Sequence, residues 1–219
     1  MTSAFIPMVG RQANFAFPLP LSERYRPKRI AEFAGLKRVK RVMTRFAAAP
    51  TCSAFLFSGP SGTGKTSMAL ALAAEMGAEI HHIAARACDL EMVERTVAQC
   101  WYMPLLGGWH VVVVDEADQM TAPAQVAWLS KLDATAFPPA TVFIFTCNGT
   151  DRLEPRFLSR TMRLEFEGEL NGEAMFFLTG VWLAEAPGTQ VPDLSAMLAE
   201  NKGNIRDVLM RLQIEILAA

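Results

Sequence analysis

The chain has 219 residues, of which 51% are hydrophobic and 20% are charged. This length suffices for one α/β unit with its own core and a small additional domain, because single domains usually take about 100–200 residues. The four cysteines (Cys52, Cys88, Cys100 and Cys147) lie far apart without a C-x-x-C pair, which excludes a zinc ribbon and a disulfide-stapled scaffold.

The net charge of −1 conceals a segregation of charge along the chain. Residues 1–50 contain ten Lys and Arg against two Glu (+8), which leaves eleven basic and twenty acidic residues (−9) in the remainder. Such a basic N-terminal quarter is compatible with a nucleic-acid partner, or with the acidic surface of a neighbouring subunit.

The sequence indicates no membrane partner. The uncharged stretch Ala174–Ala184 is far shorter than the ~20 apolar residues that a membrane span needs. No basic residue precedes the first apolar stretch, so a signal peptide is not indicated. We expect a cytoplasmic protein.

In chain order, residues 1–20 contain three prolines among isolated aromatic residues, which favours an extended arm. From Leu36 onward, apolar residues recur with helical spacing, and Pro50 ends this helix. The remaining face of the helix carries Lys37, Arg38, Lys40, Arg41 and Arg45.

The central part alternates between short apolar runs and helical patterns. Strands are predicted at 54–58, 79–83, 109–115, 141–147 and 161–166, and helices at about 65–76, 89–100 and 122–133. This alternation predicts an α/β fold with a mostly parallel five-stranded sheet and helices on both faces.

After Gly168 the pattern changes to three helices, at about 171–184, 193–200 and 203–217, with no strand among them. We therefore divide the chain into an arm (1–20), an α/β domain (21–167) and a small all-helical domain (168–219).

Residues 59–66 read GPSGTGKT and lie between a predicted strand and a predicted helix, the context that a P-loop requires. Glycines let consecutive backbone N–H groups turn around a polyphosphate, and the helix directs its positive end at the same anion. We expect Lys65 to reach the β- and γ-phosphates and Thr66 to hold Mg²⁺. The predicted phosphate-binding residues are Gly59, Pro60, Ser61, Gly62, Thr63, Gly64, Lys65 and Thr66.

The four-valine strand 111–114 ends in Asp115 and Glu116, which would emerge where ligands bind in parallel sheets. Asp115 fits a residue that organises Mg²⁺, and Glu116 fits a general base that activates water. Without the P-loop, the same residues would be interpreted as a solvated acidic turn. With it, they predict hydrolysis of a nucleoside triphosphate.

Three further residues have a functional and an ordinary interpretation. Asn148 at a strand end orients the attacking water or is a turn residue. Arg160 completes the site of a neighbouring subunit or is a surface arginine. Arg206 reaches over the nucleotide or is solvated at a helix start.

A metal site is suggested by His81, His82 and Cys88, but packing or surface roles are commoner for histidines in a strand.

Taken together, these features resemble the AAA+ ATPases, and specifically the small subunits of replication factor C, in the clamp-loader branch. The resemblance covers about residues 21–215. It rests on Glu23–Lys28 with Phe33 and Gly35, GPSGTGKT, Asp115–Asp118, Thr146–Asn148, Ser159–Arg160 and Gly203–Arg206.

The resemblance implies that Tyr25, Arg26 and Pro27 border the adenine base of ATP. It implies that Arg160 is a finger inserted into the adjacent subunit's site, so that identical or different AAA+ subunits are the expected partners. The remaining implied roles are Walker B for Asp115 and Glu116, sensor 1 for Asn148 and sensor 2 for Arg206. Members of this branch continue into a C-terminal helical collar, for which the chain after residue 168 leaves no room beside the helical lid.

The favoured function is an oligomeric ATPase that couples ATP to assembly or remodelling on DNA, as in replication or mobile elements, with a sliding clamp as one candidate partner. Lys37, Arg38, Lys40 and Arg41 are the candidate DNA contacts, although a basic helix face is often merely solvated. A protein-remodelling or scaffold ATPase is the alternative. A small-molecule kinase would not need this combination of residues, and a DEAD-box helicase would need a second domain.

Overall fold

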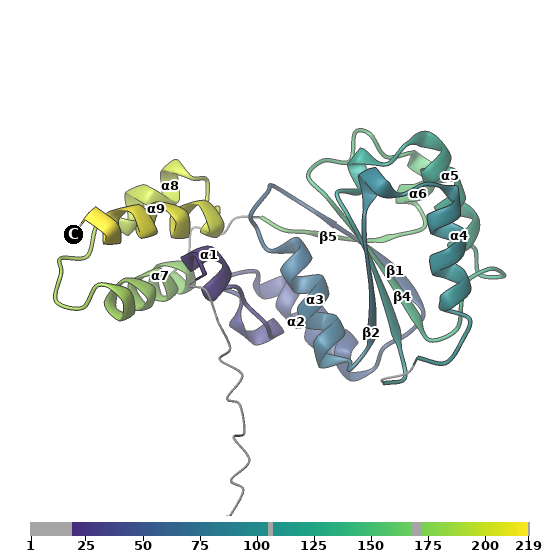
Figure 1. Cartoon of the computed structure of the whole chain (residues 1–219), viewed down its shortest axis with the longest axis horizontal. Coiled ribbons are helices and arrows are strands. Elements are labelled where there is room, and N and C mark those ends of the chain that lie inside the picture. Colours follow the sequence, from purple (N-terminus) through teal and green to yellow (C-terminus); the bar gives the residue numbers. More distant parts are fainter. Residues whose placement is uncertain (1–18, 105–106, 168–171, 219) are drawn as a thin grey trace, which may run out of the picture.

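The computed structural model describes residues 19–104, 107–167 and 172–218. All but the last two residues of the predicted arm lie outside these ranges, so the arm stays a prediction. The described residues form two lobes, a larger one around a sheet and a smaller one made of helices (Figure 1).

The larger lobe is built on five strands in the order β2-β3-β4-β1-β5, with every neighbouring pair parallel. This confirms the predicted fold class, and each strand end lies within one residue of its predicted position. The strands are β1 (Ser53–Ser58), β2 (Glu79–Ala84), β3 (His110–Asp115), β4 (Thr141–Cys147) and β5 (Met162–Glu165).

Helices cover both faces of the sheet, α2 and α3 on one and α4 and α5 on the other (Figure 1). The α-helices of this lobe are α2 (Lys37–Ala48), α3 (Lys65–Glu75), α4 (Leu90–Gln99), α5 (Ala122–Lys131) and α6 (Pro155–Leu158). Short 3-10 turns lie at η1 (Ile30–Glu32), η2 (Ala85–Ala87) and η3 (Ala117–Gln119). Neither α6 nor these turns were predicted from the sequence.

The valine run of β3 shows why this sheet is buried on both sides. Val112 and Val114 pack with the residues of α4 and α5, whereas Val111 and Val113 pack with those of α2 and α3. All four side chains are fully buried. Because neither face meets water, the strand needs no polar alternation, as is usual for parallel sheets.

Side-chain capping explains where α4 and α5 start. The side chain of Asp89 accepts a hydrogen bond from the backbone N–H of Met92 at 2.8 Å and so begins α4. Thr121 caps α5 in the same way, and Pro123 follows in the first turn, where its missing N–H has no intrahelical partner to lose.

The smaller lobe consists of α7 (Gly172–Glu185), α8 (Leu194–Glu200) and α9 (Ile205–Ala218), which pack around Leu178, Val181 and Leu212. A short helix from the other end of the chain, α1 (Leu21–Arg24), joins this core through Leu21. The division at residue 168 stays a prediction, since residues 168–171 are outside the described ranges. Within those ranges, no helix combines the length and apolarity of a membrane span.

Candidate nucleotide-binding site

The predicted P-loop connects the carboxyl end of β1 to the start of α3. Gly59 has φ +146°, and a Cβ at this position would overlap the carbonyl group of Phe166, which follows β5. Gly62 has φ +76° and lies against the side chain of Asn204, from the helical lobe. The loop therefore needs glycine at both positions, for its backbone conformation and for close packing.

Lys65 lies inside the loop and is only 8% exposed. Its Nζ atom donates hydrogen bonds to the carbonyl oxygens of Gly59 (2.6 Å) and Pro60 (2.7 Å) and to Oδ1 of Asn148 (3.1 Å). Burial lowers the pKa of Lys65, and the positive charge of Arg206 contributes to the same shift. A buried ammonium that shares its surroundings with an arginine is a site that favours a multiply charged anion.

Asp115 joins the P-loop helix to two neighbouring strands. Its Oδ1 atom accepts hydrogen bonds from the hydroxyls of Thr66 (2.8 Å) and Thr146 (2.9 Å). Its Oδ2 atom lies 2.6 Å from Nε2 of His82, on β2. Mg²⁺ prefers oxygen ligands, and the Thr66 hydroxyl beside the Asp115 carboxylate supplies them, so these residues fit the predicted cation.

Glu116 follows β3 with a left-handed backbone (φ 59°), unusual for a residue other than glycine. Its N–H donates to the Thr146 hydroxyl at 3.1 Å, which holds this conformation, while its side chain stays exposed. Sparsely populated backbone conformations often mark functional sites.

One cavity brings several of the predicted phosphate-binding and catalytic residues together. It is lined, among others, by Lys65, Thr66, Glu116, Asn148 and Arg206. The backbone N–H of Asn148 donates to Oδ1 of Asp118 at 3.4 Å, which fixes the end of β4 beside the P-loop.

A second pocket adjoins the first and is lined by Tyr25, Arg26 and Pro27, among others. Its apolar walls include Phe33, Leu36, Phe177 and Leu209. Gly62, Gly64, Ser67 and Arg206 line both pockets. Apolar walls with a few polar groups, beside the predicted phosphate-binding loop, are typical of a pocket that binds a small molecule.

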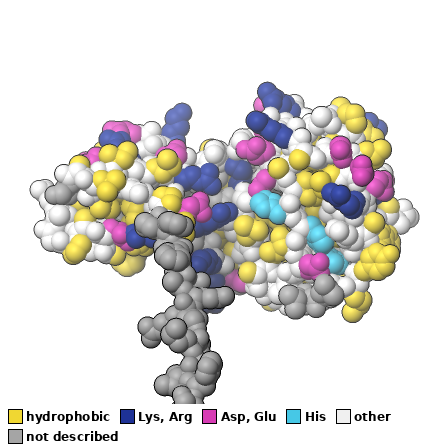
Figure 2. Space-filling model, viewed as in Figure 1, with side chains coloured by type: hydrophobic (Ala, Val, Ile, Leu, Met, Phe, Trp, Pro, Cys, Tyr) yellow, Lys and Arg dark blue, Asp and Glu magenta, His cyan; other side chains and the backbone are white. Residues whose placement is uncertain are grey.

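The segment 24–26 is held by contacts to both lobes. The hydroxyl of Tyr25 donates to Glu185 at 2.7 Å, and Arg24 forms an ion pair with the same carboxylate. Nε of Arg26 donates to the Ser67 hydroxyl, on α3, at 2.9 Å. This segment therefore sits at the junction of the lobes, where basic side chains gather (Figure 2).

Arg160 does not join this cavity. Its Nε atom donates to Asp133 at 2.8 Å, and it lines a separate pocket with Cys52 and Ser53, at the amino end of β1. Since the P-loop follows the carboxyl end of β1, a strand length of roughly 15–20 Å separates the two positions. Arg160 is therefore placed too far away to act on a nucleotide in its own chain.

The predicted basic face of α2 has two kinds of residues. Arg38 and Arg41 are exposed, and neither forms an ion pair with any of the described residues. Lys40 is instead half-buried: its Nζ atom donates to the carbonyl of Phe33 (2.8 Å) and to Glu173 of α7 (2.9 Å). Lys37 also pairs with Glu173, at 3.9 Å.

No role at this site was predicted from the sequence for Thr146, Asp118 or His82, although Thr146 and Asp118 lie in motifs that carry the family resemblance. Thr146 could have been found, because it is the last residue but one of β4 and so lies at the carboxyl end of a strand, where ligands bind in parallel sheets. His82 could not, since its contact with Asp115 depends on β2 being the neighbour of β3.

Comparison with known proteins decides the family. Residues 55–170 match the family model described as ATPase family associated with various cellular activities (AAA). The chain belongs to the AAA family. This AAA chain is 32% identical to replication factor C small subunit 2 of Pyrobaculum aerophilum, in an alignment that covers 88% of this chain. It is 29% identical to replication factor C subunit 4 of Arabidopsis thaliana, in an alignment that covers 89% of this chain. These matches confirm the predicted resemblance.

The chain spans 62% of the length of each of these two relatives. Among solved structures, the AAA fold is shared with the Thermotoga maritima RuvB Holliday junction branch migration motor. That match has a TM-score of 0.69 at 18% identity, and covers 86% of this chain and 64% of the other.

Proposed function

We propose that this AAA chain binds ATP with Mg²⁺ in the cleft between its lobes and hydrolyses it within an oligomer. One observation carries the proposal: Lys65, Glu116, Asn148 and Arg206 line a single cavity, while Arg160 lies at the far end of β1. A site that Arg160 of the same chain does not reach is suited to receive the Arg160 of a neighbouring subunit.

In this proposal the adenine base occupies the pocket beside Tyr25, Arg26 and Pro27, and the phosphates occupy the P-loop. The Lys65 ammonium exchanges its bonds to the Gly59 and Pro60 carbonyls for bonds to phosphate oxygens. Thr66 and Asp115 hold Mg²⁺, which when bound neutralises charge on the phosphates.

Glu116 is the proposed general base, since its carboxylate is exposed to the cavity beside the phosphate-binding residues. Asn148 is tied to Lys65 and would sense the γ-phosphate or orient the water that attacks it. Arg206 lines both pockets from the first turn of α9, and would tie the position of the helical lobe to the state of the nucleotide.

We propose Arg160 as the residue that completes the site of an adjacent subunit. It is exposed and held by Asp133, so its guanidinium is preorganised at the surface. On assembly, the guanidinium would leave the Asp133 carboxylate and bind the more highly charged γ-phosphate of ATP in the neighbouring subunit. Closure of the boundary between the subunits would then depend on bound ATP.

DNA is the proposed substrate of the assembly, in a role like that of a clamp loader in replication or a mobile element. The similarity to replication factor C subunits supports this role, and the exposed Arg38 and Arg41 of α2 provide phosphate contacts. A sliding clamp is a candidate further partner, and the predicted cytoplasmic location suits this function.

One observation favours the alternative of a protein partner. Met210, Ile214 and Leu217 recur at helical spacing on α9 and are 53%, 66% and 80% exposed. An exposed apolar stripe of this kind is typical of a surface that binds another protein. A scaffold or protein-remodelling ATPase would use it to hold a substrate protein.

The mass of the complex formed with a slowly hydrolysed ATP analogue, with and without primed DNA, tests the proposal. We expect a defined oligomer with the analogue, stabilised further by primed DNA, and a smaller species with the Lys65→Ala variant. A wild-type chain that stays monomeric at all concentrations with analogue and DNA would contradict it. Assembly that ignores DNA but follows a co-purifying protein would favour the alternative.

A further inference from the structure

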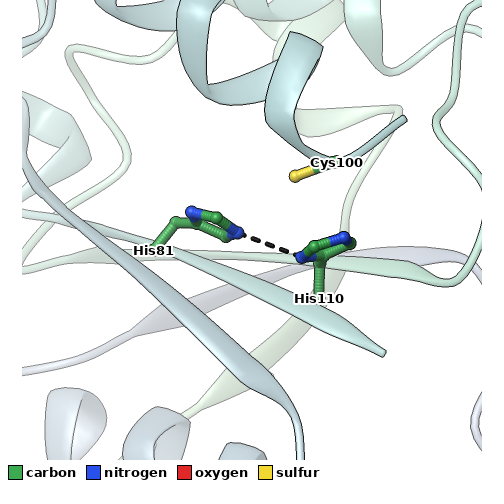
Figure 3. A group of neighbouring side chains, drawn as sticks. All are labelled: His81, Cys100 and His110. Carbon is green, nitrogen blue, oxygen red and sulfur yellow. Dashed lines mark hydrogen bonds between the residues drawn. The ribbon is translucent and has the colours of Figure 1, made fainter. Parts of the chain in front are cut away.

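Three potential metal ligands meet on the sheet face that α4 covers. His81 lies on the edge strand β2, Cys100 directly follows α4, and His110 begins β3. One ligand atom from each lies within 4.8 Å of the others, and Figure 3 shows the two rings with the sulfur beside them. Cys100 and His110 are buried and His81 is half-buried, so an ion could enter from the side of His81.

The hydrogen bonds of His110 define which ring nitrogen is free. Its Nε2 atom lies 2.9 Å from the carbonyl oxygen of Tyr102, which can only accept, so Nε2 carries the proton. Nδ1 therefore presents its lone pair to Nε2 of His81, 3.1 Å away. A histidine held by a backbone carbonyl through one nitrogen, with the other free, has the orientation usual for metal-binding histidines.

The cluster is separate from the nucleotide-binding site. His110 is the first residue of β3 and Asp115 is the last, so the two positions mark opposite ends of one strand. The neighbouring His82 faces Asp115, and the sulfur of Cys88 accepts the N–H of Trp128 at 3.3 Å. His81, His82 and Cys88, which the sequence offered together as metal-ligand candidates, lie in three different environments.

We propose that His81, Cys100 and His110 bind one Zn²⁺ through Nε2, Sγ and Nδ1. Two imidazole nitrogens and one thiolate suit zinc, which is tetrahedral and leaves its fourth position to water. On binding, the His81 proton moves from Nε2 to Nδ1 of the same ring, which frees the Nε2 lone pair for the metal, and the Cys100 thiol releases its proton to solvent. The ion would fasten the end of α4 and the start of β3 to β2, the edge strand of the sheet formed by the described residues.

The test is a titration of the full chain with ZnCl₂, after removal of bound metal with a chelator and dialysis, combined with measurement of bound zinc. We expect one zinc per chain. Cys100→Ala and His81→Gln should each weaken binding at least about 100-fold, since even the loss of an outer-shell partner costs 10–100-fold. Cys52→Ala, which removes an exposed cysteine, and His82→Ala should bind zinc as the wild type does.

Cobalt supplies a second readout, because a Co²⁺–thiolate bond gives an absorption band that identifies the sulfur ligand. The band should be present in the wild type and in Cys52→Ala, and absent in Cys100→Ala. If Cys100→Ala fails to fold, His81→Gln carries the test, because residue 81 is half-buried on an edge strand. Less than one zinc per wild-type chain would overturn the proposal, as would zinc that persists in His81→Gln but is lost in His82→Ala.

Discussion

The Nζ atom of Lys65 lies 3.1 Å from the side-chain oxygen of Asn148. This contact joins the P-loop, which follows β1, to the end of β4, and the bond from Thr66 to Asp115 joins it to the end of β3. The sheet order places these three strands side by side, so their carboxyl ends form one edge. ATP binding at this edge would therefore act on three strand ends at once.

Glu116→Gln should leave nucleotide binding unchanged and abolish turnover. The amide has the size of the carboxylate but cannot accept a proton from water, so we expect kcat to fall by at least about 10²-fold. The affinity for a slowly hydrolysed analogue should match that of the wild type, and the assembly should persist after ATP addition. Glu215→Gln, at an exposed position on α9, is the control. Normal hydrolysis by Glu116→Gln would refute the role of general base.

The double variant Arg38→Ala, Arg41→Ala should weaken DNA binding and reduce its dependence on salt. Each lost phosphate contact should lower the slope of log affinity against log salt concentration by about one. Lys40 is left in place because its bond to Glu173 links the lobes. Arg95→Ala, at an exposed position on α4, should bind DNA normally. An unchanged slope in the double variant would exclude this face as the DNA contact.

Gly59→Ala should destabilise the fold and impair ATP binding. Its added methyl group would meet the backbone of Phe166 at a strained φ, and we expect a loss of roughly 1–3 kcal/mol in the free energy of unfolding. Gly180→Ala on α7 is the matched control, because its methyl group meets no atom within 4 Å and alanine favours helices. Denaturant unfolding compares the two. Equal stability of Gly59→Ala and the wild type would contradict the described packing.

Acid should loosen the link between the lobes. The bond from Lys40 is the main cause of a lowered pKa for Glu173, and the N–H of Gly35 adds to it. Because the pKa of Glu173 is lower in the folded than in the unfolded chain, its carboxylate stabilises the folded state when the pH is above the ordinary glutamate pKa. This stabilisation is lost as the pH falls through the lowered pKa. Glu173→Gln should therefore have a lower Tm than the wild type near neutral pH, and its Tm should fall less on acidification than the Tm of the wild type.

Melting curves across a pH series check this expectation. Glu91→Gln removes an exposed carboxylate at the start of α4, away from the helical lobe, and should retain the wild-type dependence on pH. Parallel curves for Glu173→Gln and the wild type would show that this contact does not contribute.

The strands and the P-loop were predictable from the sequence because they depend on local patterns. Runs such as 111–114 report burial directly, and the glycines of the P-loop report backbone conformation. Asp115, Glu116 and Asn148 were predicted to share an edge because parallel strands present their carboxyl ends together.

Contacts between distant segments were not predictable in the same way. Helical periodicity placed Lys40 on the polar face of α2, but its partner Glu173 lies 133 residues away. The four-residue α1 is too short to show a period, although Leu21 packs in the core of the helical lobe. The histidine contacts depend on strand order, which periodicity does not report.

The most direct test of the account is ATP turnover by Arg160→Ala alone, by Lys65→Ala alone, and by their mixture. Each variant should lose most of its activity, roughly 10³-fold for Arg160→Ala, while Arg156→Ala, on the adjoining helix α6, should not. In the mixture, some boundaries would combine an intact Lys65 with an intact Arg160, so turnover should exceed that of either variant. Normal turnover by Arg160→Ala, or a mixture no more active than its components, would contradict a site shared between subunits.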